Sequence, residues 1–311
     1  MTASSPPQRM TGWEWTLLGL LSLVWGGSFF FNRILVVELH PFTIVFGRVA
    51  IAAVTLLVVL RLSGQALPRS RALWRSFFIM GLLNNLIPFA LIVWGQTQIA
   101  SGLAAILNAT TPLFTALVVH YLAKDERERL TGNRLLGVVI GFVGVVLIVG
   151  PASLAGLGLN LMAQIAVLGG AVSYGFANNF GRRFRSAGVP PLVAAAGQVC
   201  ATSVMSLPLM LIIDRPWELT MAPSLITWAA LVGLGILSTA LAYVIFFRLL
   251  SGAGAVNVAL VTLLVPASAL MLGALVFAER LDRNELLGMA VILAGLIVID
   301  GRVLVALARK L

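Results

Sequence analysis

The sequence predicts an all-α integral membrane protein, in which ten transmembrane helices form two inverted five-helix repeats around a central cavity. Three observations predict this fold class. Hydrophobic residues make up 60% of the 311 and charged residues only 10%, unlike a soluble domain. Apolar stretches of about 20 residues, the length that spans a bilayer, recur along the chain. The segment 128–137 also reappears as 279–288, with seven of ten positions identical.

Ten apolar stretches are long enough to be transmembrane spans. The first follows a short polar tail, 1–12, and is too long for a signal peptide, so we expect no cleaved leader. The connections between spans are short and leave no room for a separate soluble domain. In chain order the predicted spans are 15–36, 41–62, 76–94, 99–122, 132–150, 158–180, 191–213, 224–247, 255–278 and 286–306.

The basic residues predict how the chain lies in the membrane. With the N-terminus inside, the inner segments hold 16 of the 21 Lys and Arg residues and the outer loops hold three, in accord with the positive-inside rule. Both termini, including the tail 1–12, are therefore predicted to be cytoplasmic, in a multi-pass protein of a bacterial inner membrane. The net charge of +10 serves this orientation, so we expect the bilayer and no nucleic acid as a partner.

The repeated segment divides the chain into two units of five spans, 13–150 and 151–311. Because five is odd, the second unit enters the membrane from the opposite side, so the repeats are inverted about an axis in the membrane plane. Glycines give the fifth and tenth spans small-residue faces. We expect these faces to pack closely, either between the two spans or between protomers, which leaves a homodimer open. The glycines are Gly137, Gly141, Gly144, Gly288 and Gly295.

Several motifs carry a family resemblance. They are Trp25-Gly26-Gly27-Ser28, Phe46-Gly47-Arg48, the run Ala100–Pro112 through Glu128, and its second copy Ser251–Pro266 through Glu279. The chain resembles the ten-helix EamA-type members of the drug/metabolite transporter superfamily, which includes aromatic amino-acid exporters. The resemblance implies a transporter with a cavity between its halves, exporting amino acids or other small metabolites. A charged insert, 124–127, leaves open whether Glu126 or Glu128 takes the family's acidic loop position.

Polar side chains and prolines recur at mid-membrane depth. Such groups are costly in hydrocarbon unless they face protein or a watery cavity. We expect prolines to create hinges at Pro88, Pro112 and Pro266. The alternative for each polar residue is a hydrogen bond between helices. The candidate substrate contacts are Trp25, Ser28, Asn32, Arg48, Asn84, Asn85, Asn108, Thr111, Tyr174, Asn178, Ser238, Tyr243 and Thr262.

Arg48 is the most informative single candidate, since it lies about seven residues inside the second span. A buried arginine needs a partner or a cavity, and its planar guanidinium could bind a substrate carboxylate through two hydrogen bonds. The alternatives are that Arg48 reaches the interface, or pairs with Glu38 or a backbone carbonyl.

The missing residue types narrow the function further. No Asp or Glu lies centrally in any predicted span, which counts against a pump that carries cations or protons on a membrane carboxylate. We find no catalytic constellation, metal cluster or nucleotide loop, so we expect neither an enzyme nor a cofactor. The sequence favours a secondary transporter that exports small metabolites, amino acids foremost, by alternating access. Multidrug or cationic-compound efflux is the alternative.

Overall fold

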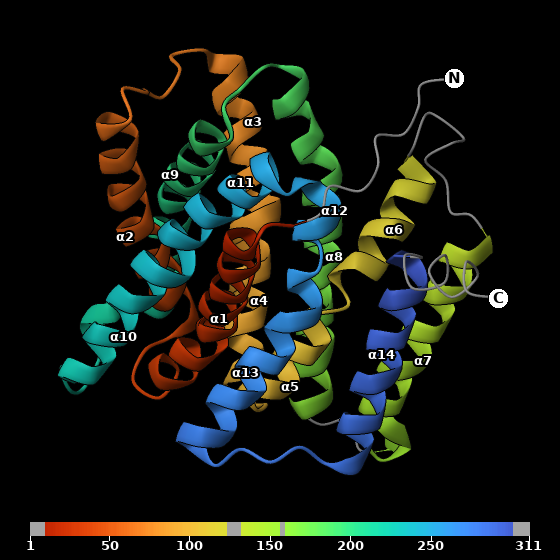
Figure 1. Ribbon diagram of the computed structural model, residues 1–311. Helices are drawn as coiled ribbons and strands as arrows, with labels where there is room; N and C mark the ends of the chain where they lie inside the picture. Colours follow the sequence, from red (N-terminus) through yellow and green to blue (C-terminus); the bar gives the residue numbers. More distant parts are fainter. Residues whose placement is uncertain (1–9, 123–131, 156–158, 301–311) are drawn as a thin grey trace, which may run out of the picture.

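The computed structural model describes residues 10–122, 132–155 and 159–300, and every regular element there is helical. The helices form ten rods in the predicted order (Figure 1). Five rods are single helices: α1 (Gly12–Leu35), α2 (Pro41–Leu62), α7 (Gly132–Ala155), α8 (Leu159–Ser186) and α14 (Arg283–Asp300). The other five rods are segmented. In the first half, the third rod consists of α3 (Arg71–Gly81), η1 (Leu82–Leu86) and α4 (Ile87–Gln96), and the fourth of α5 (Ser101–Asn108) and α6 (Thr111–Leu122). In the second half, the seventh consists of α9 (Pro191–Leu209), η3 (Met210–Asp214) and the short η4 (Pro216–Glu218), the eighth of α10 (Leu225–Gly235), η5 (Ile236–Leu241) and α11 (Ala242–Gly252), and the ninth of α12 (Gly254–Val258) and α13 (Val261–Phe277).

The predicted all-α membrane class is confirmed. Seven helical stretches of the described chain are long and apolar enough to cross a bilayer, and Leu135–Val149 and Val261–Phe277 are shorter apolar helices. Some predicted features lie wholly or partly outside the described residues: most of the tail 1–12, the insert 124–127, Glu128, and the end of the span 286–306.

Several helices extend beyond their apolar stretches. Helix α3 begins at Arg71, five residues before the predicted span, and α8 continues to Ser186, six residues after its predicted span ends. Backbone hydrogen bonding continues where the side chains become polar, whereas a hydropathy pattern detects only the apolar part.

The helices pack in a pattern that is the same from either half. The fifth span packs on the tenth (α7 on α14), and the second on the seventh (α2 on α9). The first span packs on the ninth (α1 on α13), as the sixth packs on the fourth (α8 on α5 and α6). The third packs on the sixth (α4 on α8), as the eighth packs on the first (α10 and α11 on α1). Exchanging the halves maps each contact onto another, as the predicted twofold relation requires.

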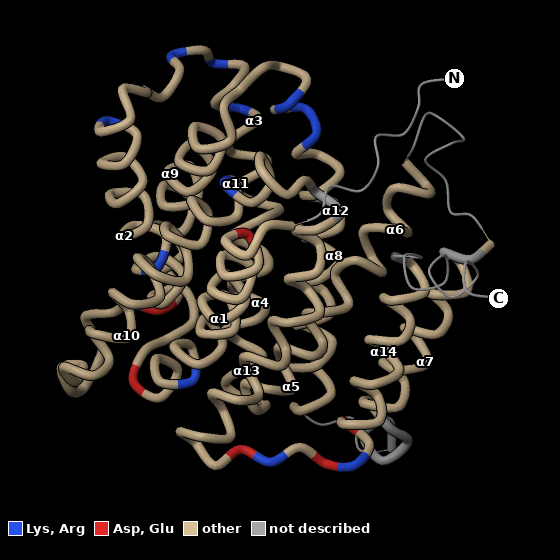
Figure 2. The backbone as a smooth tube through the Cα atoms, in the orientation of Figure 1, with Lys and Arg blue, Asp and Glu red and all other residues tan. Residues whose placement is uncertain are grey.

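Charged residues gather at the two ends of the bundle (Figure 2). Helix α1 runs from the first end towards the second, and α8 runs back. We call the first the basic end; it carries Arg61, Arg69, Arg71, Arg75, Arg182, Arg183 and Arg185. We call the second the acidic end; it carries Glu38, Asp214, Glu218, Glu279, Asp282 and Glu285.

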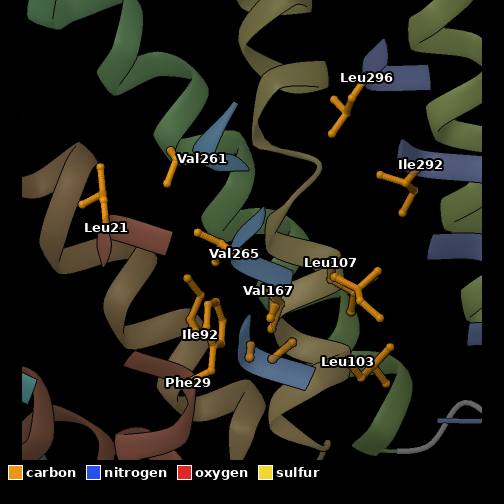
Figure 3. Close-up of a cluster of buried hydrophobic side chains, with 14 of the residues drawn as sticks. Leu21, Phe29, Ile92, Leu103, Leu107, Val167, Val261, Val265, Ile292 and Leu296 are labelled. Atoms are coloured by element: carbon orange, nitrogen blue, oxygen red, sulfur yellow. The ribbon is translucent and has the colours of Figure 1, made fainter. Parts of the chain in front are cut away.

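Two apolar cores hold the bundle together, and both contain residues from the two halves. One joins α1, α5, α8, α13 and α14 and includes Leu21, Leu107 and Val265 (Figure 3). The other joins α2, α4, α9 and α10 around Leu56 and Leu234. Neither half therefore has a core of its own within the described residues.

The predicted glycine faces meet each other within one chain. Helices α7 and α14 stand beside the main bundle as a close pair (Figure 1). A Cβ added to Gly144 would come within 2.7 Å of the Gly288 carbonyl, and one added to Gly295 within 2.6 Å of the Gly137 carbonyl. The glycines thus allow direct contact between two helix backbones, which settles the alternatives in favour of packing between the fifth and tenth spans.

Four rods are interrupted at matching places in the two halves. The third and eighth each contain a π-helical stretch, Leu82–Leu86 and Ile236–Leu241. The fourth and ninth each break between two helices, at Ala109–Thr110 and at Ala259–Leu260. Interruptions that recur in both inverted copies mark the segments that surround a binding site in many transporters.

The predicted hinge prolines take different places relative to these interruptions. Pro112 is the second residue of α6, where the helix start leaves the backbone N–H without a partner in any case. Pro88 follows the π-helical stretch inside the continuous helical rod Arg71–Gln96, and the Ser173 hydroxyl donates to the Leu83 carbonyl of the preceding turn at 2.7 Å. Pro266 instead lies inside α13, and its rod breaks six residues earlier, at Leu260. There the Ala259 carbonyl accepts both the Thr262 backbone N–H at 3.1 Å and the Thr262 hydroxyl at 2.7 Å.

Gly144→Leu is expected to destabilise the protein by several kcal/mol, at or above the ~1–3 kcal/mol typical of overpacking, because the new side chain meets the backbone of α14. Gly19→Leu is the matched control, since a Cβ there meets nothing within 4 Å. The measurement is thermal unfolding in detergent. Equal melting temperatures for the two variants would contradict the close contact of α7 with α14.

Candidate functional site

A cavity of about 1210 Å³ lies between the two halves and reaches the basic end. Its wall there includes the exposed residues Arg185, Gly188 and Pro190. The loops of the acidic end contribute nothing to the wall. The described structure is therefore open at the basic end and closed at the acidic end.

Twelve of the thirteen predicted contact residues line this cavity. Asn85 is the exception, because it lies fully buried behind the wall. Its Nδ2 donates to Thr202 Oγ1 at 3.1 Å, and its Oδ1 accepts from the Tyr243 hydroxyl at 3.0 Å. Asn85 therefore supports the wall and does not face a ligand. The twelve are Trp25, Ser28, Asn32, Arg48, Asn84, Asn108, Thr111, Tyr174, Asn178, Ser238, Tyr243 and Thr262.

Arg48 lies on the cavity wall about 10 Å along α2 from its start, with 7% of its surface exposed. Its Nε donates to Thr239 Oγ1 at 2.8 Å, and its Nη2 donates weakly to Ser28 Oγ at 3.4 Å. The guanidinium carbon lies 3.7 Å from the centroid of the Phe89 ring, which stabilises the cation through the ring's negative face.

All the partners of Arg48 found among the described residues are neutral. The predicted pairing with Glu38 does not occur, since that carboxylate accepts the Ser224 N–H at the acidic end. The low exposure also rules out that Arg48 reaches the interface. Two hydroxyls and a ring orient the guanidinium without neutralising it. An uncompensated charge in a low-dielectric wall attracts anions that enter the cavity more strongly than it would in water.

The π-helical stretch of the eighth rod fixes how Thr239 meets Arg48. The Thr239 hydroxyl donates its own proton to the Leu234 carbonyl, five residues back, at 2.9 Å. Its lone pairs are therefore left for the Nε–H of Arg48. The π-helical stretch thus orients the Thr239 hydroxyl so that its oxygen accepts from Arg48 and holds the guanidinium in place.

The matching stretch of the third rod builds a polar network across three rods. Asn84 Nδ2 lies 3.1 Å from both Gln198 Oε1 and the Tyr243 hydroxyl oxygen. Tyr243 in turn donates to Asn85. One wall of the cavity is thus a connected set of neutral hydrogen-bonding groups.

Gln96 lies behind the cavity wall, next to Asn32. It is fully buried, accepts from Asn32 Nδ2 at 2.9 Å, and donates to the Phe29 carbonyl at 2.9 Å. Three residues of the cavity wall keep a buried oxygen with no protein partner among the described residues: Asn32 Oδ1, Asn108 Oδ1 and Ser238 Oγ. Neither amide oxygen is exposed in the described conformation, so each would accept a hydrogen bond from a ligand N–H only after the wall rearranges.

Aromatic rings form another part of the wall. Trp25 and Phe246 lie with ring centroids 5.5 Å apart, and Tyr243 stacks on Phe247 at 6.1 Å. All four residues line the cavity. The site therefore combines one buried cation, uncharged polar groups and an aromatic surface, with Arg182 and Arg185 on the wall at the basic end, and no Asp or Glu lines it among the described residues.

Comparison with known proteins agrees with this architecture. The sequence model of the EamA-like transporter family matches residues 12–150 and again 161–300. The chain belongs to this family. It is thus a membrane transporter and not an enzyme, and the two matches fall on its two five-helix halves.

Relatives of this EamA-like transporter align over nearly their whole length. The uncharacterized transporter YoaV of Bacillus subtilis is 26% identical, over 90% of this chain and 94% of its own. The uncharacterized inner membrane transporter YedA of Escherichia coli is 28% identical, over 90% and 88%. Protein PecM of Dickeya dadantii is 25% identical, over 89% of each. One crystal structure, 20% identical, covers 91% of this chain and 96% of its own with a TM-score of 0.64, which shows the fold alone.

Some residues of the EamA-like site were not predicted from the sequence. Phe89, Gln198 and Thr239 shape the surroundings of Arg48 and Asn84. For Gln198 a signal existed, because an amide within an apolar span needs a partner. For Phe89 none existed, since nothing in the sequence pairs a phenylalanine of the third span with an arginine of the second.

Thr239→Val is expected to destabilise the protein by ~1.5–3 kcal/mol, because the buried Nε–H of Arg48 loses its acceptor. Thr55→Val makes the same change on α2, where the hydroxyl donates only to the Ile51 carbonyl of its own helix at 2.8 Å. We expect Thr55→Val to stay within about 0.5 kcal/mol of the parent. Thermal unfolding in detergent compares the two, and an unchanged Thr239→Val protein would contradict the assigned role.

Proposed function

We propose that this EamA-like protein is a secondary transporter of a bacterial inner membrane that exports small metabolites, amino acids foremost, by alternating access. The single observation that carries the substrate class is Arg48. It is a buried cation at the cavity wall whose partners among the described residues are all neutral. A carboxylate that enters the cavity supplies the missing countercharge and can bind the guanidinium in a bidentate manner.

The rest of the wall suits the other parts of an amino acid. The amide oxygens of Asn32 and Asn108 are buried behind the cavity surface, and a rearrangement of the wall on binding would let them accept hydrogen bonds from an ammonium group. The rings of Trp25 and Phe246 offer an apolar surface to a side chain. A zwitterion also fits a wall in which Arg48 is the buried charge and no described residue is a carboxylate.

Export is the direction that the family resemblance implies, and the described conformation is open at the end from which an exported substrate would enter. The cavity reaches the basic end, which the positive-inside rule assigns to the cytoplasm. Substrate would enter from there and bind near Arg48. The interrupted rods would then rearrange to close the basic end and open the acidic one, since broken and π-helical segments are the places where rods bend most easily.

Multidrug or cationic-compound efflux is the alternative function, and the aromatic wall is the observation that favours it. Flat hydrophobic cations stack well on rings such as Trp25 and Phe246. The fixed charge of Arg48 opposes it, because like charges repel strongly in a low-dielectric site. Charge therefore separates the two candidate functions more sharply than shape.

The test is uptake of radiolabelled amino acids into proteoliposomes, with and without a pH gradient. We expect saturable uptake that unlabelled amino acids inhibit. Amines that lack the carboxylate should inhibit it at least about tenfold more weakly. Saturable transport of quaternary ammonium compounds with no amino-acid flux would instead establish the alternative function.

Arg48→Gln is expected to lower kcat/KM for amino acids by about 10- to 100-fold, because a charge-assisted contact to the carboxylate is lost. Arg48→Lys keeps the charge but not the planar fork, so an intermediate value is expected. Arg61→Gln on the same helix, at the exposed basic end, is the control and should transport normally. Equal kcat/KM values for the Gln variant and the parent would show that Arg48 does not bind substrate.

A further inference from the structure

Three carboxylates at the acidic end each cross from one half of the protein to the other. Glu279, from the second half, accepts the backbone N–H groups of Ser101 and Gly102 at 3.1 and 3.2 Å. It also accepts the Ser101 hydroxyl at 2.7 Å, and its Oε1 lies 3.7 Å from Nε of Arg33. Its side chain is only 13% exposed.

The other two carboxylates bind in the same manner. Asp214 of the second half accepts the backbone N–H of Thr43 at 2.6 Å and its hydroxyl at 2.9 Å. Glu38 of the first half accepts the backbone N–H of Ser224 at 2.7 Å. This hydrogen bond holds the pKa of Glu38 below its ordinary value, so the carboxylate stays charged at neutral pH.

Each of these carboxylates meets the start of a helix that belongs to the opposite half. Ser101 and Gly102 begin α5, Thr43 lies in the first turn of α2, and Ser224 is the N-cap of α10. A helix start has free N–H groups and a partial positive charge, so it favours an anion. A charged acceptor makes these contacts stronger than neutral hydrogen bonds.

The backbone conformation before Glu279 also favours its contact with the start of α5. Ala278 ends α13 with a φ of 53°, in the left-handed region that alanine rarely adopts. This turn directs the chain back, so that Glu279 reaches the start of α5. Strained residues of this kind persist where the surrounding contacts hold them.

We propose that Glu279, Asp214 and Glu38 together form the gate that closes the cavity at the acidic end. The contacts run in both directions between the halves, so the halves cannot separate at this end while the carboxylates stay on the helix starts. Opening to this side requires all three to withdraw. The inference rests on the proposed alternating access, but its test below needs no substrate.

The test uses a single reporter cysteine in the cavity. Cys200→Ser removes the native thiol, and Leu263→Cys places the reporter in the first turn of α13, where the side chain lines the cavity and is half-buried. A membrane-impermeant maleimide is applied separately to each side of oriented vesicles. Glu279→Gln is expected to raise the labelling rate from the acidic-end side about tenfold, because the neutral amide holds the helix start less strongly.

Glu218→Gln is the matched control. Its carboxylate lies at the same end but pairs with Arg215 of its own half at 3.2 Å, so labelling should stay at the parent rate. Asp214→Asn and Glu38→Gln repeat the test should Glu279→Gln fail to give a monodisperse protein. We expect each to raise labelling from the acidic-end side alone.

Two results would overturn the gate. One is a parental labelling rate in folded Glu279→Gln and Asp214→Asn. The other is an equal rise from both sides, which indicates general loosening of the bundle. Amino-acid transport with unchanged labelling would overturn the gate and leave the proposed function intact. Increased one-sided labelling in a protein that carries no amino acid would support the gate and overturn the substrate class.

Discussion

The arrangement around the cavity depends on keeping one guanidinium charged inside a membrane protein. Removing a cation from water costs several kcal/mol in a protein interior, and a neighbouring carboxylate usually offsets that loss. Around Arg48 the structure uses weaker means: a hydroxyl whose proton is committed elsewhere, a second hydroxyl, and a ring face. These hold the guanidinium in position while leaving its charge available. These contacts depend on the π-helical turn that orients Thr239, on Phe89 near the start of α4, and on the open cavity beside Arg48.

Much of this could be predicted from the sequence, because bilayer length and polar residues inside apolar spans are strong signals. The spans, the polar cavity and Arg48 follow from them. The partners of Arg48 do not, since Thr239 lies 191 residues away along the chain. The sequence also could not predict that Asn84 lines the cavity whereas Asn85 lies behind its wall. Neighbouring helical residues point about 100° apart, and a π-helical turn shifts that phase in a way that hydropathy does not encode.

The break of the ninth rod shows a related limit. A proline predicts that a backbone hydrogen bond is missing, but not which carbonyl the chain will release or where the rod divides. Around Pro112 the break lies close by, at Thr110, whereas around Pro266 a regular helix has already begun. At both breaks a threonine hydroxyl donates to the carbonyl three residues back, and the threonines mark both breaks more closely than the prolines do.

The shared cores have a consequence for how such a chain must be made. The most extensive helix pairs, α7 with α14 and α1 with α13, join one repeat to the other, and both apolar cores do the same. A single five-helix unit would therefore leave its inward faces bare in the bilayer. It could cover them only against a second unit inserted in the opposite sense. Synthesis of the first half thus ends before its packing partners exist. Its helices must therefore remain stable in the bilayer without these partners until the second half has been inserted.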